Sequence, residues 1–383
     1  MLKETVAYFD HASTTPVRKS AADAMEEFIR VSYGNPSSPH YLGRVTRKAI
    51  DKARDTVAEC IGARSREVIF TGSGSEAIFL SVVGAAIGNQ HRGKHVITST
   101  FEHHATLGAF KFLEEQLGFE VKRVRIDPRG LIKMSELDAS IRDDTILIST
   151  MFANNEIGTM QNITGFKQII GDREIILHSD CVQGWGKFEM NVNDYPVDIA
   201  CGAAHKFGGP KGVGFLYIKD GIHVESLQKG SHEFGMRSGT ENVAGIVGAA
   251  VALEEAISEL ESNEEKLADY RKQLVEFLRS IAPDCTFNGI EEYSYPGTLN
   301  VTIPGVSGEM MVLALDREGV ACSTGSACTT GSVGPSHVLT SMGLSLIDAT
   351  SSLRLSLGYT TTQEEIDYFK SVFPEIYDRI KQS

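Results

Sequence analysis

The chain has 383 residues, of which 42% are hydrophobic and 23% charged, and its formal net charge is −13 at pH 7. These proportions are those of an ordinary globular protein, and the length is sufficient for two domains. The acidic balance argues against nucleic acid or an anionic membrane surface as the main partner.

Between about residues 20 and 220, short runs rich in β-branched residues alternate with helical patterns. Strands are predicted at residues 68–71, 95–98, 120–126, 145–149, 175–178, 199–201 and 213–218. Helices are predicted between them, for example at 44–61, 105–117 and 135–141. Several of the strands lack polar alternation, as strands covered on both faces do. The alternation therefore indicates an α/β domain with a largely parallel sheet.

The pattern changes after residue 240. Residues 244–282 carry apolar side chains near helical spacing and predict a long helical stretch, interrupted around Ser262 and Asn263. Strands follow at 298–303 and 353–357, and an amphipathic helix begins at Gln363. We therefore expect a large α/β domain at residues 16–255 and a smaller α+β domain at 1–15 and 256–383.

The segment Phe-Thr-Gly-Ser-Gly-Ser-Glu, residues 70–76, joins a predicted strand to an apolar helix. Small residues such as Gly74 let backbone N–H groups approach an anion, and a helix N-terminus favours negative charge. Ser75 can add a hydroxyl donor. A tight turn with a capping serine explains the same residues equally well.

Asp180 and Gln183 follow the apolar strand predicted at residues 175–178, at the sheet edge where α/β proteins bind their ligands. A carboxylate at Asp180 can keep a heteroaromatic nitrogen protonated, and Gln183 can donate to a ring oxygen. Taken alone, Asp180 is better explained as a helix cap.

Lys206 comes after a further strand, within His-Lys-Phe-Gly-Gly-Pro-Lys of residues 205–211. A lysine at the end of a strand in a desolvated pocket can form a Schiff base. The glycines do not indicate a P-loop, because the spacing differs and no Ser or Thr follows the lysine.

Residues 322–335 run from Cys322 through Cys328 to Pro335 with almost no bulky apolar side chain. Such a segment cannot bury itself, so the Cys328 thiol is expected on an exposed, mobile loop where it can react. Cys322 ends an apolar run and is expected to be buried. Because the Cys-x5-Cys spacing does not match familiar zinc patterns, no metal site is predicted.

The six cysteines, at residues 60, 181, 201, 285, 322 and 328, are scattered along the chain. They do not form the disulfide framework of a small secreted protein, so a reducing, cytoplasmic location is expected. The first ten residues lack the apolar stretch of a signal peptide, and the apolar run of residues 244–253 is too short to span a membrane.

An acidic residue, a glutamine three positions later and a His-Lys pair after one more strand resemble the pattern of pyridoxal-phosphate enzymes with the aspartate-aminotransferase fold (fold type I). More narrowly, the chain is similar to group I cysteine desulfurases of the NifS/IscS kind, within the class-V aminotransferases. The matching motifs are residues 8–16, 34–40, 102–104, 154–158, 237–242 and 352–358, with the Cys328 segment. The resemblance implies a mainly parallel seven-stranded sheet in the large domain.

The resemblance also implies how the cofactor ring is bound. Lys206 would hold pyridoxal 5'-phosphate covalently and move protons. Asp180 would pair with the pyridinium nitrogen and sustain the electron sink. Gln183 would contact the phenolic oxygen, while His104 would stack on the ring and act in acid–base steps.

The phosphate and the substrate have implied binding residues as well. Gly74, Ser75 and His205 would bind the phosphate, and Thr240 would reach across from the second subunit of a homodimer. Arg354 would bind the substrate carboxylate, helped by Asn155, which would also contact the cofactor.

The implied catalytic residues are Lys206, His104 and Cys328. The reaction would remove sulfur from L-cysteine, leave L-alanine and place a persulfide on Cys328 for an acceptor protein, such as an iron–sulfur scaffold or a thiolation protein. The family usually has serine at the position of Ala203, and the loss of one neutral hydrogen bond would weaken cofactor binding by about 1 kcal/mol.

Three alternative functions stay open. A selenocysteine lyase of the same fold would use the same cofactor residues, whereas an aminotransferase of that fold would have no need of a cysteine on a mobile loop. A non-enzymatic scaffold would instead use Cys322 and Cys328 to hold a metal or an iron–sulfur cluster.

Overall fold

The central sheet has seven strands, each at the position predicted for it within a few residues. In the computed structural model, which describes residues 6–325 and 334–382, their order is β2-β8-β7-β6-β5-β3-β4. Their bounds are β2 Val68–Thr71, β3 His95–Ser99, β4 Glu120–Val124, β5 Thr145–Met151, β6 Ile176–Asp180, β7 Ile199–Ala203 and β8 Gly214–Ile218. β8 alone runs in the direction opposite to the other six strands, so the prediction of a mainly parallel sheet is confirmed.

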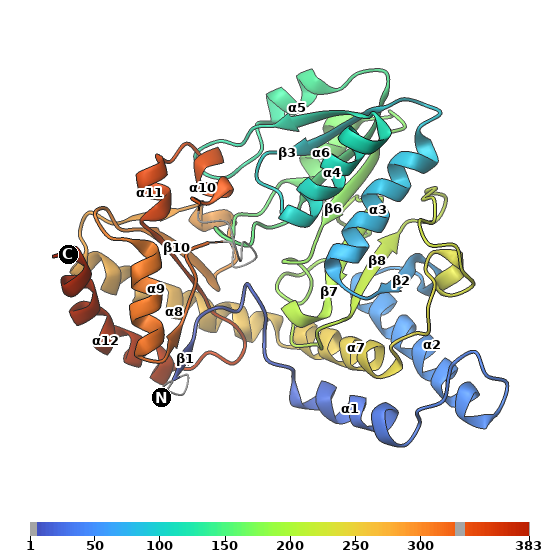
Figure 1. Ribbon diagram of the computed structural model, residues 1–383, viewed down its shortest axis with the longest axis horizontal. Helices are drawn as coiled ribbons and strands as arrows, with labels where there is room; N and C mark the ends of the chain where they lie inside the picture. Colours follow the sequence, from blue (N-terminus) through green and yellow to red (C-terminus); the bar gives the residue numbers. More distant parts are fainter. Residues whose placement is uncertain (1–5, 326–333, 383) are drawn as a thin grey trace.

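Helices cover both faces of this sheet, which explains why its strands are apolar on both sides (Figure 1). On one face the core includes side chains of α1 Lys19–Arg30, α2 Tyr41–Ile61, α5 Met134–Ser140, α6 Ile163–Ile170 and α7 Val243–Ser258. On the other face α3 Gly74–Asn89 and α4 His104–Leu117 pack in a separate cluster. The sheet is thus the middle of three layers.

A smaller part of the chain has its own hydrophobic core. Its sheet places β10 Thr298–Thr302 between β12 Ser352–Ser356 and β9 Thr286–Asn288, all antiparallel. A separate two-stranded ladder joins β1 Ala7–Tyr8 in parallel to β11 Val320–Ala321. Helices α8 Leu260–Ile281, α9 Gly308–Arg317 and α12 Gln363–Lys381 pack against these strands.

The interruption of the long helical stretch lies at Glu259, three residues before the predicted position. Glu259 has φ −102° and ψ 3°, and its carboxylate accepts from the Arg18 guanidinium at 2.8 Å. Helix α7 therefore ends where Glu259 binds Arg18 of the N-terminal segment. The spacing of apolar residues along the helix gives no indication of this contact.

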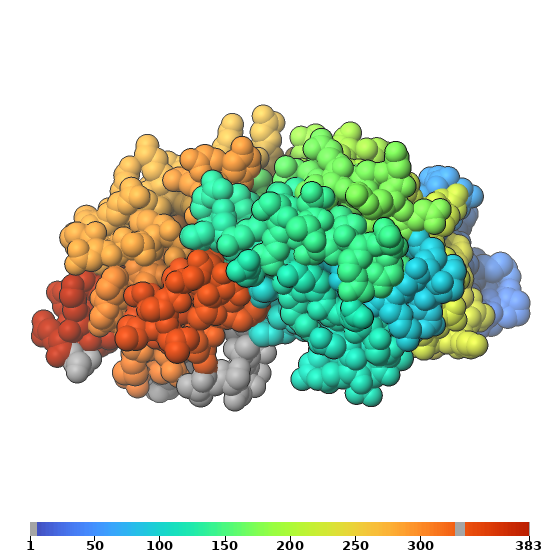
Figure 2. Space-filling model, turned by 90° about the horizontal axis from the view of Figure 1, so that it is seen from above, coloured from blue at the N-terminus to red at the C-terminus, as the bar shows by residue number. Residues whose placement is uncertain are grey.

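Two short helices connect the smaller part of the chain to the part that contains the large sheet. Helices α10 His337–Ser341 and α11 Leu346–Thr350 belong to the C-terminal third of the chain, yet Val338, Leu339 and Met342 pack into the core of the large sheet. Figure 2 shows the orange and red C-terminal residues lying directly against the green and blue-green ones. The boundaries of the two domains stay a prediction.

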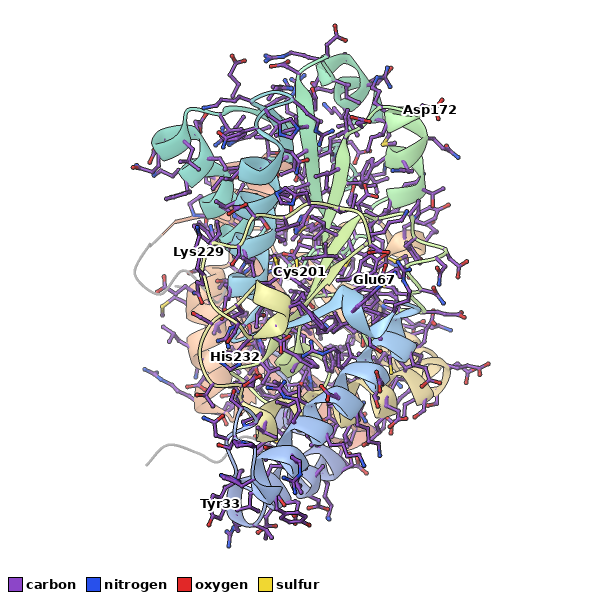
Figure 3. The ribbon with its side chains drawn as sticks, turned by 90° about the vertical axis from the view of Figure 1, so that its right-hand side faces the viewer. Tyr33, Glu67, Asp172, Cys201, Lys229 and His232 are labelled. Carbon is purple, nitrogen blue, oxygen red and sulfur yellow. The ribbon has the colours of Figure 1, made fainter. Side chains whose placement is uncertain are left out.

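Cys201 lies in the interior of the large part, far from Tyr33 at one end and Asp172 at the other (Figure 3). Cys181 and Cys201 are both buried and pack in the two cores on either side of the large sheet. None of the described helices has the combination of length and apolarity that a membrane crossing needs.

We expect Gly202→Ala to destabilise the protein by about 1–3 kcal/mol, since a Cβ at Gly202 would lie 2.4 Å from the Phe215 ring and 2.8 Å from that of Trp185. Urea unfolding measures the effect. The matched control is Gly108→Ala in α4, where a Cβ meets nothing within 4 Å; better helix propensity should make that variant about 0.5–1 kcal/mol more stable. Equal stabilities of the two variants would contradict the packing argument.

Candidate active site

A pocket of about 170 Å³ lies at the carboxyl ends of the central strands. This is the edge at which open α/β sheets bind ligands. Eight of the residues predicted from the sequence to form the site line it: Gly74, Ser75, Asn155, Asp180, Gln183, His205, Lys206 and Arg354. Tertiary structure therefore brings residues from distant motifs to one place.

The β2–α3 turn forms one end of the pocket. The N-cap of α3 is Ser73, whose hydroxyl accepts from the Glu76 N–H at 3.1 Å, so Ser75 is not the capping serine. Ser75 is exposed and lines the pocket. A Cβ at Gly74 would lie 3.0 Å from the Cβ of Ala203. The close approach requires small residues there, and the free N–H groups of the helix N-terminus favour an anion.

Asp180 ends β6 and is 4% exposed. Its Oδ1 accepts from the Val182 N–H at 3.0 Å, and turns rather than a helix follow, so it is not a helix cap. Burial raises the pKa of Asp180 to about 6, against the opposing effects of the Val182 N–H and the Lys206 charge. A cationic ligand atom beside Asp180 would stabilise its ionised form and so lower this pKa.

Lys206 lies in a single 3-10 turn, Ala204–Lys206, directly after β7. Its Nζ donates to the backbone oxygens of Ala12 at 2.6 Å and Ser13 at 2.8 Å. The ring of His205 approaches the hydroxyl of Thr14, at 3.2 Å. Burial, together with the charge of Lys206, lowers the pKa of His205 to about 4. The N-terminal segment thus closes the pocket over the lysine, and His205 is neutral near pH 7.

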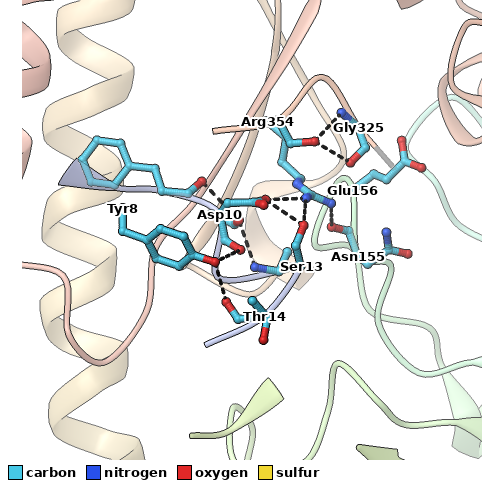
Figure 4. A network of polar contacts seen from close by, with 12 residues as sticks. Tyr8, Asp10, Ser13, Thr14, Asn155, Glu156, Gly325 and Arg354 are labelled. Carbon is cyan, nitrogen blue, oxygen red and sulfur yellow. Dashed lines mark hydrogen bonds and ion pairs between the residues drawn. The ribbon is translucent and has the colours of Figure 1, made fainter. Parts of the chain in front are cut away.

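Arg354 is only 1% exposed, so it is not a surface arginine. One terminal nitrogen donates to Asp10 Oδ1 at 2.7 Å and to the hydroxyl of Ser13 at 2.8 Å, and the other donates to the carbonyl of Asn155 at 3.0 Å (Figure 4). Its Nε has no hydrogen-bond acceptor among the described residues. A buried guanidinium with an unused donor can bind an additional carboxylate.

The structure does not place His104 in the pocket. His104 is the first residue of α4, is exposed, and lies against His337 with 4.7 Å between ring centroids. The preceding His103 lines the pocket instead, and burial together with the Lys206 charge lowers its pKa to about 4. Adjacent side chains diverge at a helix start, so only one of the pair can face inward. The Glu-His-His motif contains no signal that separates the two.

Two predicted residues remain, Thr240 and Cys328. Thr240 is exposed and does not line the pocket. Cys328 lies outside the described residues. Cys322 is partly buried against the core of the smaller part, and burial raises the pKa of its thiol. Within residues 6–325 and 334–382, no group of three or more His, Cys, Asp or Glu side chains could hold a metal ion.

Lys187 is a functional candidate that no sequence motif marks. Its Nζ donates to Gln183 Oε1 at 2.5 Å, and burial lowers its pKa to about 7. The one available signal is its position four residues after Gln183.

Comparisons with known proteins agree with this geometry. Residues 7–369 match the model of the family described as aminotransferase class-V. The cysteine desulfurase IscS of Dictyoglomus turgidum is 42% identical over 98% of this chain and 95% of its own length. A solved structure described as a NifS-like protein superimposes with a TM-score of 0.92, at 36% identity over 97% of this chain and 99% of that one. A structure described as SspA in complex with cysteine has a TM-score of 0.81, at 32% identity over 93% of this chain and 100% of that one.

In cofactor-free protein, Asp180→Asn should raise the free energy of unfolding at pH 7.5 by on the order of 2 kcal/mol. At that pH the folded parent protein must ionise a buried carboxyl whose pKa is raised from 3.8 to about 6, whereas the unfolded parent ionises it freely. The Asn variant does not have this cost. Below about pH 4 both states are protonated, so the difference should disappear as the pH falls from 6 to 4.

Urea unfolding across this pH range measures the difference. The matched control is Asp172→Asn, which changes an exposed carboxyl and should leave stability nearly unchanged. A difference between Asp180→Asn and the parent protein that does not vary with pH would show that the buried charge is not its cause.

Proposed function

Since the chain belongs to the class-V aminotransferase family, we propose that it is a pyridoxal-phosphate-dependent cysteine desulfurase. Its substrate is L-cysteine and its products are L-alanine and sulfur bound to the protein. The observation that carries the proposal is the convergence of Lys206, Asp180 and Arg354 on one pocket beside the N-terminus of α3. Relatives named for desulfuration of cysteine favour this reaction over transamination.

The residues of the pocket fit pyridoxal phosphate. The first turn of α3, with Gly74 and Ser75, offers N–H and hydroxyl donors to a phosphate. The buried carboxylate of Asp180 suits a protonated ring nitrogen, and the neutral His205 can donate to the phosphate. When bound, pyridoxal phosphate supplies an electron sink that makes the Cα–H of an amino acid acidic.

Each protein group then has a defined task. Lys206 holds the cofactor through its Nζ and carries protons at that atom. Arg354 orients the substrate by its carboxylate, because its fork is held rigidly by Asp10 and by the Asn155 carbonyl. Burial of the guanidinium keeps water away from this end of the substrate.

We assign the ring-facing histidine to His103 in place of His104. His103 Nδ1 accepts from the Ala105 N–H at 3.1 Å, which fixes the ring at the cap of α4. Its lowered pKa keeps the ring neutral near pH 7, and because Nδ1 is an acceptor, the proton of the neutral ring lies on Nε2, from which it can be donated.

Ala203 bears on cofactor affinity. Its Cβ lies against the position of Gly74, so this side of the phosphate site offers a methyl group where a serine would offer a donor. The expected cost is about 1 kcal/mol of binding, or roughly a fivefold weaker affinity.

The remaining parts of the proposal concern sulfur delivery. Cys328 takes the sulfur as a persulfide and passes it to an acceptor protein of iron–sulfur cluster assembly or thiolation. In a homodimer Thr240 would bind the phosphate in the site of the second subunit. This accounts for the exposure of Thr240 away from the pocket of its own chain. All five described cysteines are unpaired, which supports a reducing cytoplasmic location.

Protein loaded with pyridoxal phosphate should be yellow and should convert L-cysteine to L-alanine, while Lys206→Ala should lose both properties. Cys328→Ala should keep the colour but lose sulfur transfer by on the order of 10²-fold or more, because the nucleophile is gone. Absorbance, alanine and sulfide assays measure these effects, and Cys285→Ala is the matched control.

A colourless wild type that forms no alanine would refute the proposed function. Full sulfur transfer by Cys328→Ala would refute only the role of that cysteine. Much faster release of selenide from L-selenocysteine than of sulfide from L-cysteine would favour a lyase for selenocysteine.

His103→Gln should lower kcat by roughly 10²–10⁴-fold, the usual contribution of a general acid–base group. His104→Gln should stay close to wild type, because its exposed ring faces His337 and not the pocket. Steady-state kinetics with L-cysteine separates the two. The opposite ranking of the variants would restore His104 as the ring-facing residue.

A further inference from the structure

A second lysine lies beside Lys206. Lys187 comes from the turn after β6, and its Nζ lies 5.1 Å from the centre of the Tyr295 ring. Together with Lys206 and His11 it lines a small cavity of about 30 Å³ that adjoins the pocket. The residues given roles above do not include it.

Three hydrogen bonds connect the two lysines. Lys187 Nζ donates to Gln183 Oε1 at 2.5 Å, and Gln183 Nε2 donates to the carbonyl of Ala12 at 3.0 Å. Lys206 Nζ donates to the same carbonyl at 2.6 Å. A lysine ammonium can only donate, so it binds the oxygen of the amide and leaves the NH2 group on the side of Lys206.

We propose that Lys187 is a positioning residue that holds the Gln183 amide with its NH2 group turned towards Lys206. This inference rests on the proposed cofactor site, in which Gln183 contacts the phenolic oxygen. In this orientation the amide donates to that oxygen. The reversed amide would present its own oxygen to another acceptor, and the contact would be lost.

The charges around Lys187 couple its protonation to that of Lys206. Burial lowers its pKa to about 7, and the charges of Lys206 and Arg354 act in the same direction. The titratable and charged groups around it are His11, Arg18, His205, Lys206, Glu264, Tyr295, Arg354 and Tyr359. Glu264 is the one carboxylate among the described residues of the small cavity. This repulsion is mutual, so the cationic form of Lys187, which predominates below about pH 7, disfavours a second positive charge on Lys206 Nζ.

The test is a pH titration of the visible absorbance of protein loaded with pyridoxal phosphate. In Lys187→Met the midpoint should rise by about one pH unit, because a cation and an oriented donor that both oppose protonation of the lysine–cofactor linkage are lost. Lys187→Arg keeps charge and donor and should restore most of the wild-type midpoint. Lys272→Met removes an exposed lysine of α8 and should change nothing.

A double-variant cycle tests whether Lys187 acts through Gln183. Gln183→Leu should raise the midpoint by itself, and adding Lys187→Met should then raise it by less than half of the single-variant shift. Additive shifts would overturn the positioning role, as would an unchanged midpoint in Lys187→Met. If Lys187→Met is insoluble, Lys187→Gln removes the charge and gives the same comparison.

The outcomes also separate this inference from the proposed function. A wild type that binds no pyridoxal phosphate would overturn both. A yellow wild type with an unshifted midpoint in the Lys187 variants would overturn the positioning role alone.

Discussion

The pocket depends on the burial of one guanidinium. Arg354 is almost fully removed from water, and a buried charge must be compensated by acceptors in good geometry. Asp10, Ser13 and the carbonyl of Asn155 provide them. This compensation fixes the N-terminal segment across the pocket, so that the carbonyls of Ala12 and Ser13 meet Lys206. The substrate site and the lysine site are thus consequences of a single electrostatic requirement.

The same pocket contains several titratable groups whose charged form, the ordinary one in water for Asp and Lys, is disfavoured by burial. Asp180 has a raised pKa, while His103, His205 and Lys187 have lowered ones, in each case mainly because of burial. A chain selected only for stability would replace such groups with apolar ones. Their presence together is the expected signature of a site that exchanges stability for the binding of a charged ligand.

The sequence was sufficient for the strands of the large sheet and for the residues that end them, because β-branched runs and the polar residues after them are local signals. It was insufficient where a helix end or the direction of a side chain depends on a contact with a residue distant in the sequence. Glu259 breaks the helical stretch beside Arg18, and His103 rather than its neighbour faces the pocket because of how α4 begins. Lys187 is marked by no motif, since its role is defined by one amide and by the cations around it.

The pairing of Asp10 with Arg354 joins residues 344 positions apart. Because a ribosome delivers the N-terminus first, Asp10 leaves the ribosome long before β12 exists. The segment that covers Lys206 can already contact Gln183 and the turn after β7 at that stage, but Asp10 lacks its Arg354 partner until synthesis is nearly finished. The order of translation therefore lets the N-terminal segment cover Lys206 first, and the Arg354 end of the pocket is completed last.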